Sequence, residues 1–592
     1  MAVNFQNSFN ARNLDPKEIA KNFIYSQSFD VLKNKCHTVI LGARGCGKTT
    51  LMKMLTLPAL YNWDYIGAHK FIEDIPFYAI YIPTDISWLY KDFALNDTKI
   101  DKKIIDLVSK FSVNTNIFES VCDTFLNVIT HEFNNDDSLL DAEISLSLIL
   151  IDLLKLDFDI APRLESIKEN LRYRRNIINQ NLSKLIYNNN YDFEYFDFLH
   201  LNYIDVLPLI LDHFKRIFEP KKNSWALCFD ELEFAPIWLK KQLYTLLRST
   251  DQRILFKLSS SPILPKEVDE VLKGDAGASL GNDFEIIKMW DTNSQSSNEF
   301  SKKLIDSLLK KKNIRVRAKD YFGSNFRYLD GLETYTTDSE YLSQIKSLAT
   351  KDISFREYLI NKNIDPQNPI PTDKVQLASV FRKIKPIVYY RNYFIKDNTS
   401  TKISYSINKK YIELYSGYEV LIGITDGNPR WLIGLINSIL NRSDLHKADT
   451  NIQYDEVERT SNRFINFINN TPYHKQGSKI SIIEFIERVG DFFKESLLGK
   501  VFNPEPYSSF TYDSNIMDFT EIIEKGLLQG AFILLDEGDE NFDFELNNKR
   551  FRLSYMYSHQ FKLPLRTGKE IKVDKIISDN ITVPNLFNYD EN

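Results

Sequence analysis

The sequence predicts an α/β fold, in which a parallel sheet with flanking helices carries large helical additions and a smaller C-terminal domain. The apolar run His37–Leu41 reads as a buried strand, and a glycine-rich loop and a helical pattern follow it directly. Farther along, a helical stretch separates the apolar strands Trp225–Phe229 and Arg253–Leu258, an order typical of parallel pairing. The run Ile75–Pro83 reads as a further strand of the same sheet.

The chain of 592 residues is long enough for roughly three to four domains. Apolar residues recur at helical spacing in Phe118–Phe133, Leu139–Leu156 and Leu164–Leu185, which predicts a helical insertion. The expected divisions are an N-terminal arm (1–35), a core (36–299) with the insertion at about 100–215, a helical lid (300–454) and a C-terminal domain (455–592).

The C-terminal domain is expected to resemble a winged helix, because two helical stretches precede a hairpin. The hairpin is predicted from Ala531–Leu535 and Phe542–Leu546, which flank an acidic turn. A DNA-binding winged helix should be basic, and this region is acidic overall. Five basic residues could still make a local phosphate-contacting face, so contact with DNA and contact with protein both stay open: Lys549, Arg550, Arg552, Lys562 and Arg566.

Composition excludes several classes of protein. The net charge of −6 gives no general electrostatic support for nucleic-acid binding. The four cysteines are scattered and make no C-x-x-C pair, which argues against a zinc site or a disulfide framework. No apolar run is long enough for a membrane span, and no signal peptide is evident. These features predict a cytoplasmic protein without membrane contact.

The loop after the first strand has the pattern G-x-x-x-x-G-K-T between a strand and a helix, the context that a phosphate-binding loop requires. Its glycines let backbone N–H groups turn toward phosphate oxygens. Lys48 can reach the β- and γ-phosphates, and Thr49 can ligate Mg²⁺. The expected nucleotide-binding residues are Gly42, Ala43, Arg44, Gly45, Cys46, Gly47, Lys48, Thr49 and Thr50.

The strand Trp225–Phe229 ends in Asp230 and Glu231, the usual partner of such a loop. Asp230 at the strand tip can hold the Mg²⁺ shell. Glu231 can polarise the attacking water, which favours hydrolysis over phosphate transfer to a small molecule. Glu233 shares an alternating face with Glu231 if the strand continues, and otherwise serves as a solvated or capping acid before the next helix.

Two later segments complete the expected nucleotide site. The strand Arg253–Leu258 runs into Ser259–Ser261, and a polar residue there can touch the γ-phosphate or the water, with Ser259 as the chosen candidate. The turn Gly427-Asn428-Pro429 opens an apolar helix with Arg430 in its first turn. A cation at a helix start opposes the helix dipole unless an anion lies nearby, and a γ-phosphate is such an anion.

In this order, the phosphate loop, Phe229-Asp230-Glu231, the serine-ended strand and Gly427-Asn428-Pro429-Arg430 resemble the AAA+ superfamily. The resemblance is to its origin-recognition and replication-initiator branch and to the related STAND signalling ATPases. Three further phrases resemble bacterial origin-recognition-like AAA ATPases, some of which lie in mobile or defence gene clusters: Asn10–Leu14, Arg552–Tyr555 and Leu563–Arg566. The resemblance implies ATP as the nucleotide, Ser259 as a sensor-1 residue and Arg430 as a sensor-2 residue.

The chain departs from ring-forming AAA+ proteins at the arginine finger. Between Pro262 and Phe284 there are lysines and no arginine, and Arg248 and Arg253 are the nearby alternatives. The gap weakens the expectation of an ATP-bridged ring, and a homo-oligomer stays open.

The complete hydrolysis set, with no second catalytic motif, predicts an ATPase that uses Mg²⁺ and acts as a switch or motor in a multi-protein assembly. Any effector chemistry would then come from a partner subunit, and the resemblance suggests bacterial antiviral defence. One alternative is a DNA-binding initiator or loader, although the net charge does not support nucleic acid as a partner. A second alternative is a scaffold that ATP stabilises with little turnover.

Overall fold

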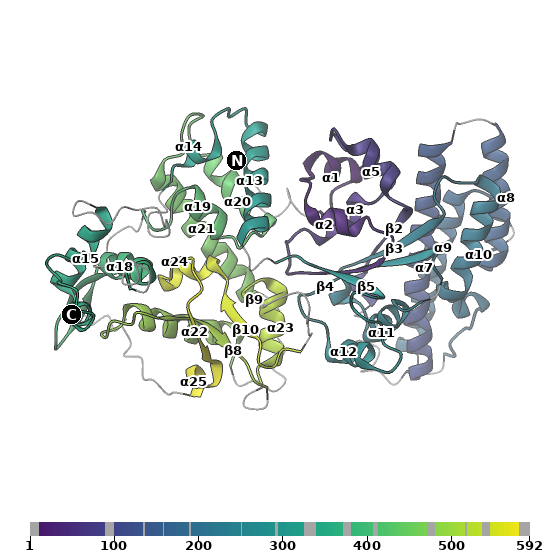
Figure 1. Cartoon of the computed structure of the whole chain (residues 1–592). Helices are drawn as coiled ribbons and strands as arrows, with labels where there is room; N and C mark the ends of the chain where they lie inside the picture. Colours follow the sequence, from purple (N-terminus) through teal and green to yellow (C-terminus); the bar gives the residue numbers. More distant parts are fainter. Residues whose placement is uncertain are drawn as a thin grey trace. The chain divides into compact units, whose positions relative to one another are not determined.

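The computed structural model divides the chain into two compact units (Figure 1). We call Asn10–Gly42 with Gly47–Met289 the N-terminal unit, and Ala43–Cys46 with the chain from Trp290 onward the C-terminal unit. The structure describes residues 11–88, 100–133, 137–157, 159–188, 191–249, 251–290, 294–324, 339–370, 380–406, 412–470, 480–514, 518–535 and 545–578.

A five-stranded sheet forms the centre of the N-terminal unit. Its strands follow the order β2-β3-β4-β1-β5, and every pairing is parallel. The strands are β1 (His37–Leu41), β2 (Phe77–Pro83), β3 (Ser224–Asp230), β4 (Ile254–Ser260) and β5 (Phe284–Lys288). The four strands that the sequence predicts are therefore present, and the α/β class with a parallel sheet is confirmed. Because all strands run the same way, their carboxyl ends meet at one edge.

The strands are apolar because helices cover the sheet, as is usual for parallel sheets. All seven residues of β3 and of β4 are buried. One core joins Ile40, Ala226 and Leu255 of the sheet with apolar residues of the neighbouring helices. The shorter helices of this unit are α1 (Pro16–Asn22), α2 (Gln27–Leu32), α3 (Lys48–Met54), α4 (Leu57–Tyr61), α5 (Ala68–Asp74), α11 (Ile237–Leu246) and α12 (Lys266–Lys273), with 3₁₀ turns η1 (Asp197–His200) and η2 (Leu232–Phe234).

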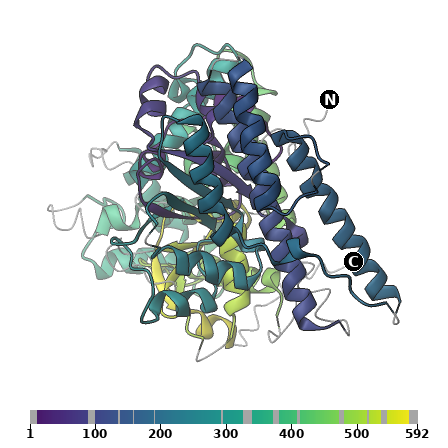
Figure 2. The same cartoon turned by 90° about the vertical axis from the view of Figure 1, so that its right-hand side faces the viewer.

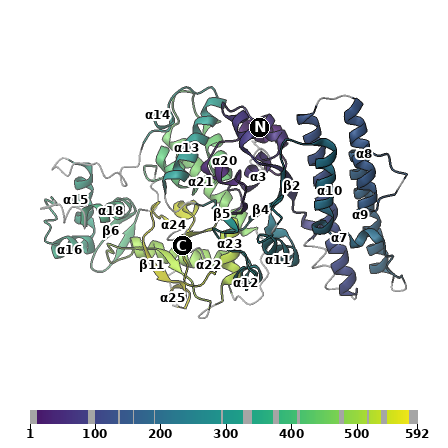
Figure 3. The same cartoon turned by 45° about the vertical axis from the view of Figure 1, so that its right-hand side comes forward.

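Four longer helices lie alongside one another next to β2 (Figure 3). They are α7 (Lys102–Glu132), α8 (Asp137–Leu153), α9 (Leu164–Tyr187) and α10 (Tyr203–Phe218). Figure 2 brings these blue helices to the front. They include the three helical stretches that the apolar spacing predicts. The stacked rings of Phe125 and Phe214, with centroids 4.0 Å apart, join α7 to α10, and Trp225 of β3 packs edge-on against both rings.

The first part of the C-terminal unit is mainly helical. Its elements are α13 (Ser294–Lys311), α14 (Ala318–Phe322), α15 (Glu340–Lys351), α16 (Ile353–Asn361), α18 (Arg382–Phe394), α19 (Tyr418–Gly423), α20 (Pro429–Leu440) and α21 (Thr450–Asn469). The short antiparallel pair β6 (Ile395–Asn398) and β7 (Ile403–Tyr405) interrupts the helices and was not predicted from the sequence. The helix expected after the Gly-Asn-Pro turn is present as α20, with Arg430 in its first turn.

The last part of the unit is a four-stranded mixed sheet in the order β11-β8-β10-β9. Its elements are α22 (Ile482–Leu498), β8 (Tyr507–Thr511), α23 (Thr520–Gln529), β9 (Phe532–Leu535), β10 (Arg550–Leu553), η4 (Tyr555–Tyr557), α24 (Ser558–Phe561), β11 (Lys569–Lys572) and α25 (Val573–Ser578). Phe485 of α22 lies edge-on against Phe510, Phe519 and Phe532, which joins this helix to the sheet.

The first strand of the expected hairpin is present as β9. In the part of the chain that the structure describes, β9 pairs in antiparallel fashion with β10, Arg550–Leu553. Residues 542–544 lie outside the described residues, and Glu545 and Leu546 are not in a strand. The physical reason for the pairing with β10 is burial: Phe551 and Leu553 of β10 are almost fully buried against the sheet core. Within the part of the chain that the structure describes, no helix is long and apolar enough to cross a membrane.

Candidate nucleotide-binding and hydrolysis site

The glycine-rich loop connects β1 to α3, as the motif requires. β1 ends at Leu41, and α3 begins at Lys48. Gly45 has a φ of 83° and Gly47 a φ of 105°, conformations that residues with a Cβ rarely adopt. The two glycines therefore permit the loop path that directs backbone N–H groups inward.

Lys48 of α3 is buried beside two oxygen atoms of the site. Its Nζ donates to the carbonyl of Gly42 at 2.6 Å and lies 3.9 Å from Glu233 Oε1. Both side chains of this ion pair are only 6% exposed. Glu233 Oε2 is buried and has no hydrogen-bond partner among the described residues. Glu233 is therefore a buried acid facing the loop lysine, and not the solvated acid that the sequence left open.

Asp230 ends β3 at the carboxyl edge of the sheet and is 1% exposed. Its Oδ1 accepts from Ser259 Oγ at 2.5 Å and from the N–H of Glu231 at 3.0 Å. Its Oδ2 accepts from the hydroxyl of Tyr81 at 3.0 Å. Since a carboxylate offers about four lone-pair sites, Oδ2 retains one acceptor position. Asp230 is thus held in place on three sides and can still accept from a metal-bound water.

Ser259 lies between Asp230 and the start of the phosphate loop. It faces Ile40 of β1 in the parallel register, and β4 stands between β3 and β1. Its hydroxyl donates to Asp230 and accepts from the N–H of Glu231 at 3.0 Å. The neighbouring serines have other contacts: Ser260 O accepts from Gly42 N, and Ser261 Oγ donates to Ile263 O. Of the three serines, Ser259 is the one placed on the acidic pair.

Glu231 occupies a strained backbone position. Its φ of 57° and ψ of 41° place it in the left-handed region, which costs a non-glycine residue about 1–3 kcal/mol. Its side chain forms an ion pair with Arg12 of the N-terminal arm, with Nη1 and Oε2 3.4 Å apart. Such strain persists where the surroundings impose it, and here the hydrogen bonds of Glu231 N to Asp230 and Ser259 do so.

Sequence reasoning missed two residues that support Asp230. Burial, and secondarily the charge of Asp230, raises the pKa of Tyr81, so its hydroxyl stays protonated and can donate. Thr84 Oγ1 donates to the carbonyl of Asp230 at 2.6 Å. The pairing of Pro83 with Asp230 explains both contacts, because β2 ends beside β3. The only signal in the sequence was the predicted strand Ile75–Pro83.

The middle of the loop, Ala43–Cys46, belongs to the C-terminal unit, where it meets the Gly-Asn-Pro-Arg turn. Asn428 caps α20 by accepting from Arg430 N at 3.1 Å, and its Nδ2 donates to the carbonyl of Arg44 at 2.9 Å. A Cβ at Gly45 would lie 2.9 Å from the Cβ of Arg430. Gly45 is therefore required by this close approach as well as by its φ.

The same turn is anchored to the C-terminal sheet by Asp426. Its Oδ1 accepts from Arg552 Nη2 at 2.8 Å, and its Oδ2 accepts from Ser554 Oγ at 2.6 Å and from Tyr555 N at 2.9 Å. The side chains of Asp426 and Arg552 are 7% and 10% exposed. Asp426 thus joins two phrases noted in the sequence, because it directly precedes Gly427–Arg430 and binds Arg552–Tyr555.

The two arginines considered as alternatives for an arginine finger have other contacts. Arg253 binds Asp212 and Asp251, and these hydrogen bonds raise its pKa. Arg248 Nη1 donates to the carbonyl of Gly277 at 3.4 Å.

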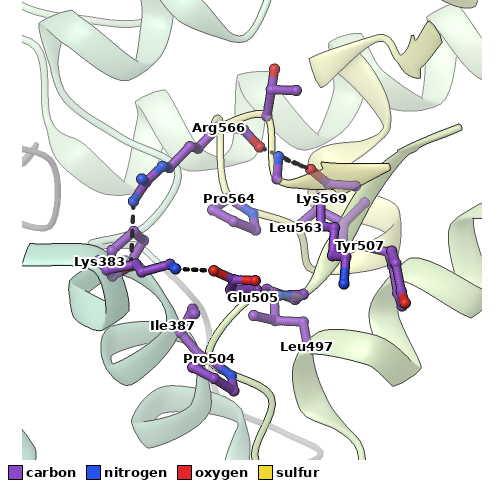
Figure 4. Close-up of a pocket in the computed structure, with 15 residues that line it drawn as sticks. Lys383, Ile387, Leu497, Pro504, Glu505, Tyr507, Leu563, Pro564, Arg566 and Lys569 are labelled. Atoms are coloured by element: carbon purple, nitrogen blue, oxygen red, sulfur yellow. Dashed lines mark hydrogen bonds and ion pairs between the residues drawn. The ribbon is translucent and has the colours of Figure 1, made fainter. Parts of the chain in front are cut away.

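A cavity of about 350 Å³ lies in the C-terminal unit, and none of the predicted nucleotide-binding or hydrolysis residues lines it (Figure 4). Pro504, Leu497 and Ile387 form part of its apolar wall, and Lys383 pairs with Glu505 across it. The third phrase noted in the sequence, Leu563–Arg566, contributes Leu563, Pro564 and Arg566 to the lining.

The residues fit a magnesium–nucleotide complex. Glu233 Oε2 lacks a partner in the described part of the chain, and a metal-bound water is the kind of donor it lacks. Asp230 and the hydroxyl of Thr49 would supply the oxygen ligands that Mg²⁺ prefers. The buried ammonium of Lys48 would be the cation for the phosphates.

The sheet order and the loop define an α/β protein with a P-loop core. A family model described as ORC-CDC6-like matches residues 4–573. The chain belongs to this family, an initiator-like branch of AAA+ proteins, whose members are nucleotide-binding and usually ATPases. The resemblance noted in the sequence is thereby confirmed at the level of the family. No curated protein and no solved structure matches the chain.

Proposed function

We propose that the chain binds ATP with Mg²⁺, hydrolyses it, and acts as a nucleotide-driven switch or motor in a multi-protein assembly. The observation that carries the proposal is the group at the end of β3, in which the buried Asp230 and Ser259 adjoin the partly exposed Glu231. Ser259, Tyr81 and the N–H of Glu231 all donate to Asp230, and a carboxylate fixed in this way beside a second carboxylate is the arrangement that hydrolysis needs.

Each residue has a distinct role in this proposal. Lys48 exchanges its contacts with Gly42 O and Glu233 for the phosphates. Asp230 and Thr49 hold Mg²⁺, which neutralises part of the phosphate charge when it is bound. Glu231 orients the attacking water and accepts its proton. Ser259 keeps Asp230 and the backbone of Glu231 in register. Contact of Arg430 with the γ-phosphate stays a prediction from the sequence.

The proposal of a switch rests on the turn that contains Asp426 and Asn428. Asn428, directly before α20, donates to the carbonyl of Arg44 in the phosphate loop. Asp426, two residues earlier, binds Arg552, Ser554 and Tyr555 at the C-terminal sheet. A change in the loop on nucleotide binding or release is therefore coupled, through one short turn, to the C-terminal sheet.

A protein partner is favoured over DNA by the contacts of the basic residues. Arg552 is buried and paired with Asp426. Arg550 binds Ser509 and the carbonyl of Gly568 and pairs with Glu570. The ammonium of Lys562 lies 5.2 Å over the ring of Phe394, and burial lowers its pKa. These three of the five candidate phosphate contacts serve the internal structure, so the DNA-binding alternative gains no support from them.

The hydrolysis proposal is tested by two variants and a matched control. We expect Lys48→Ala to lose binding of a fluorescent ATP analogue. We expect Glu231→Gln to bind ATP normally and to turn it over at least about a hundredfold more slowly, because it keeps the shape of the side chain and loses the base. Glu73→Gln, an exposed acid of the same unit, should behave as the wild type. Unchanged turnover in Glu231→Gln would show that the assignment is wrong.

The biological role of the proposed ATPase is tested separately. Bacterial antiviral defence predicts that phage plating falls when the chain is expressed with the genes encoded beside it, and that Lys48→Ala removes this protection. A DNA-binding initiator predicts a salt-dependent shift of duplex DNA in a gel. An ATP-stabilised scaffold predicts that ATP raises the midpoint of thermal unfolding while turnover stays at background.

A further inference from the structure

A guanidinium lies against the carboxylate that we propose as the base for hydrolysis. Arg12 Nη1 is 3.4 Å from Glu231 Oε2, and the two side chains are 39% and 27% exposed. The two residues are far apart in the chain, and both belong to the N-terminal unit. The contact places a cation of the N-terminal arm at the carboxyl edge of the sheet, where the phosphate loop begins.

The arm is fixed at this position by the helix that follows the phosphate loop. Lys53 of α3 donates to the carbonyls of Ala11, Arg12 and Leu14 at 2.8–3.0 Å. Because all three donors of one ammonium are directed to the arm, the backbone on both sides of Arg12 is held. Burial is the main cause of the lowered pKa of Lys53. The nearby charge of Arg12 lowers this pKa further, whereas the nearby charges of Asp230 and Glu231 raise it.

The next turns of the chain hold the arm as well. Asp15 and Glu18 form a capping box at the start of α1, in which Asp15 accepts from Glu18 N at 2.7 Å. Ile19 and Ala20 of α1 are 2% exposed and belong to the same core as α3. The backbone of Arg12 is thus fixed at both ends, while its side chain remains partly in solvent and can change partners.

We propose that Arg12 is a catalytic arginine supplied by the chain itself, and that it moves from Glu231 to the γ-phosphate when ATP binds. The proposal rests on the hydrolysis function proposed above. A γ-phosphate carries more negative charge than one carboxylate and matches the planar guanidinium with paired acceptors, so it competes for Arg12. The exchange also releases the carboxylate of Glu231 for the attacking water.

In the reaction, the water oxygen bonds to the γ-phosphorus as the bond from that phosphorus to the β–γ bridging oxygen breaks. Glu231 accepts the proton of the water, and the electron pair of the broken bond stays on the β-phosphate of ADP. Arg12 donates hydrogen bonds to the γ-phosphoryl oxygens, where charge builds in the transition state. This is the role that an arginine finger has in other nucleotide hydrolases, whether it is supplied by a partner or in cis.

The assignment accounts for an absence in the sequence. No arginine occurs between Pro262 and Phe284, where ring-forming AAA+ proteins carry the finger. Of the alternatives, Arg253 is paired with two carboxylates and Arg248 donates to a carbonyl on α12's C-terminal side. Arg12 contacts Glu231 from within the same unit, so a partner subunit is not needed for this charge.

The test compares Arg12→Ala, Arg12→Lys and the control Lys17→Ala, an exposed cation on the same arm. We measure ATP turnover, the dissociation constant of a fluorescent ATP analogue, and trapping of ADP with aluminium fluoride, a mimic of the transition state. We expect Arg12→Ala to lose turnover by about a hundredfold or more and to lose trapping, with ATP affinity changed by less than about tenfold. Arg12→Lys should recover part of the turnover, and Lys17→Ala should match the wild type.

Two outcomes would overturn the proposal: turnover of Arg12→Ala equal to or above that of the wild type, or full trapping of ADP–aluminium fluoride. Glu231→Gln is measured in parallel. Loss of turnover in Glu231→Gln with normal turnover in Arg12→Ala would refute the catalytic arginine alone, whereas normal turnover in both would refute the hydrolysis function itself. If Arg12→Ala does not fold, Arg12→Gln gives the same comparison with a side chain of similar reach.

Discussion

Replacing Asp426 should lower the free energy of unfolding of the C-terminal unit by more than a surface substitution there does. This carboxylate is a buried connection between the Gly-Asn-Pro-Arg turn and the sheet. It accepts three hydrogen bonds, from Arg552, Ser554 and Tyr555. Asp426→Ala removes all three and leaves the guanidinium of Arg552 buried without its charge partner.

The expected loss can be worked from these contacts. Breaking a buried ion pair by removing one partner costs about 3–5 kcal/mol. Asp426 has a φ of 52°, and an alanine in this left-handed conformation adds about 1 kcal/mol. Part of the cost is offset because Arg552 still donates to Leu553 O and still lies 3.8 Å over the ring of Tyr555. We therefore expect Asp426→Ala to lower the free energy of unfolding by about 4 kcal/mol.

The assay is urea unfolding followed by circular dichroism and tryptophan fluorescence. Asp426→Asn keeps the shape and tolerates the positive φ, so we expect about half the loss. Asp320→Ala, at an exposed ion pair with Arg317, is the matched control and should leave the transition unchanged. A loss below about 1 kcal/mol in Asp426→Ala would refute the reasoning, because it would mean that the buried pair contributes no more than a surface pair.

Two further predictions concern other buried charges. Arg391 is fully buried, binds Asp352 through Nε and Nη2 at 2.9 and 2.6 Å, and donates to the carbonyls of Leu497 and Gly499. Arg391→Lys cannot reproduce this fork and should lower the free energy of unfolding by about 2–4 kcal/mol, which urea unfolding measures; a change within error would contradict it. Burial lowers the pKa of Lys257 to about 8. Because the unfolded chain then binds more protons between about pH 8 and 10.5, stability should rise with pH across this window by about 3 kcal/mol relative to Lys257→Met, and parallel curves for the two proteins would contradict it.

The sequence predicted which residues lie at the carboxyl edge of the sheet, because the signals for the loop and the strand ends are local. An apolar run, glycines at fixed positions and a lysine before a helix define the loop within about a dozen residues. The acids after Phe229 and the serine after Leu258 follow the same logic, since both stand at strand ends. In a parallel sheet these ends lie at one edge, so their proximity follows from the order of strands.

What the sequence could not provide are contacts between distant segments. The pairing of Arg12 with Glu231 has no signature in spacing, and its only trace was the phrase Asn10–Leu14. The support of Asp230 by Tyr81 depends on β2 lying next to β3, which the chain order alone does not fix. The pairing of β9 with Arg550–Leu553 was not predicted, because this segment and Phe542–Leu546 both alternate in the sequence and local pattern does not rank them.

The proposed function requires that Lys48, Asp230 and Glu231 form a site that cleaves ATP. The most direct measurement is a single-turnover reaction, in which excess protein with Mg²⁺ is mixed with ATP labelled at the γ-phosphate and the products are separated over time. We predict that the wild type converts the bound ATP to ADP and phosphate, and that Glu231→Gln holds it intact over the same period. Intact ATP on the wild type after many hours, or equal cleavage by both proteins, would contradict the account.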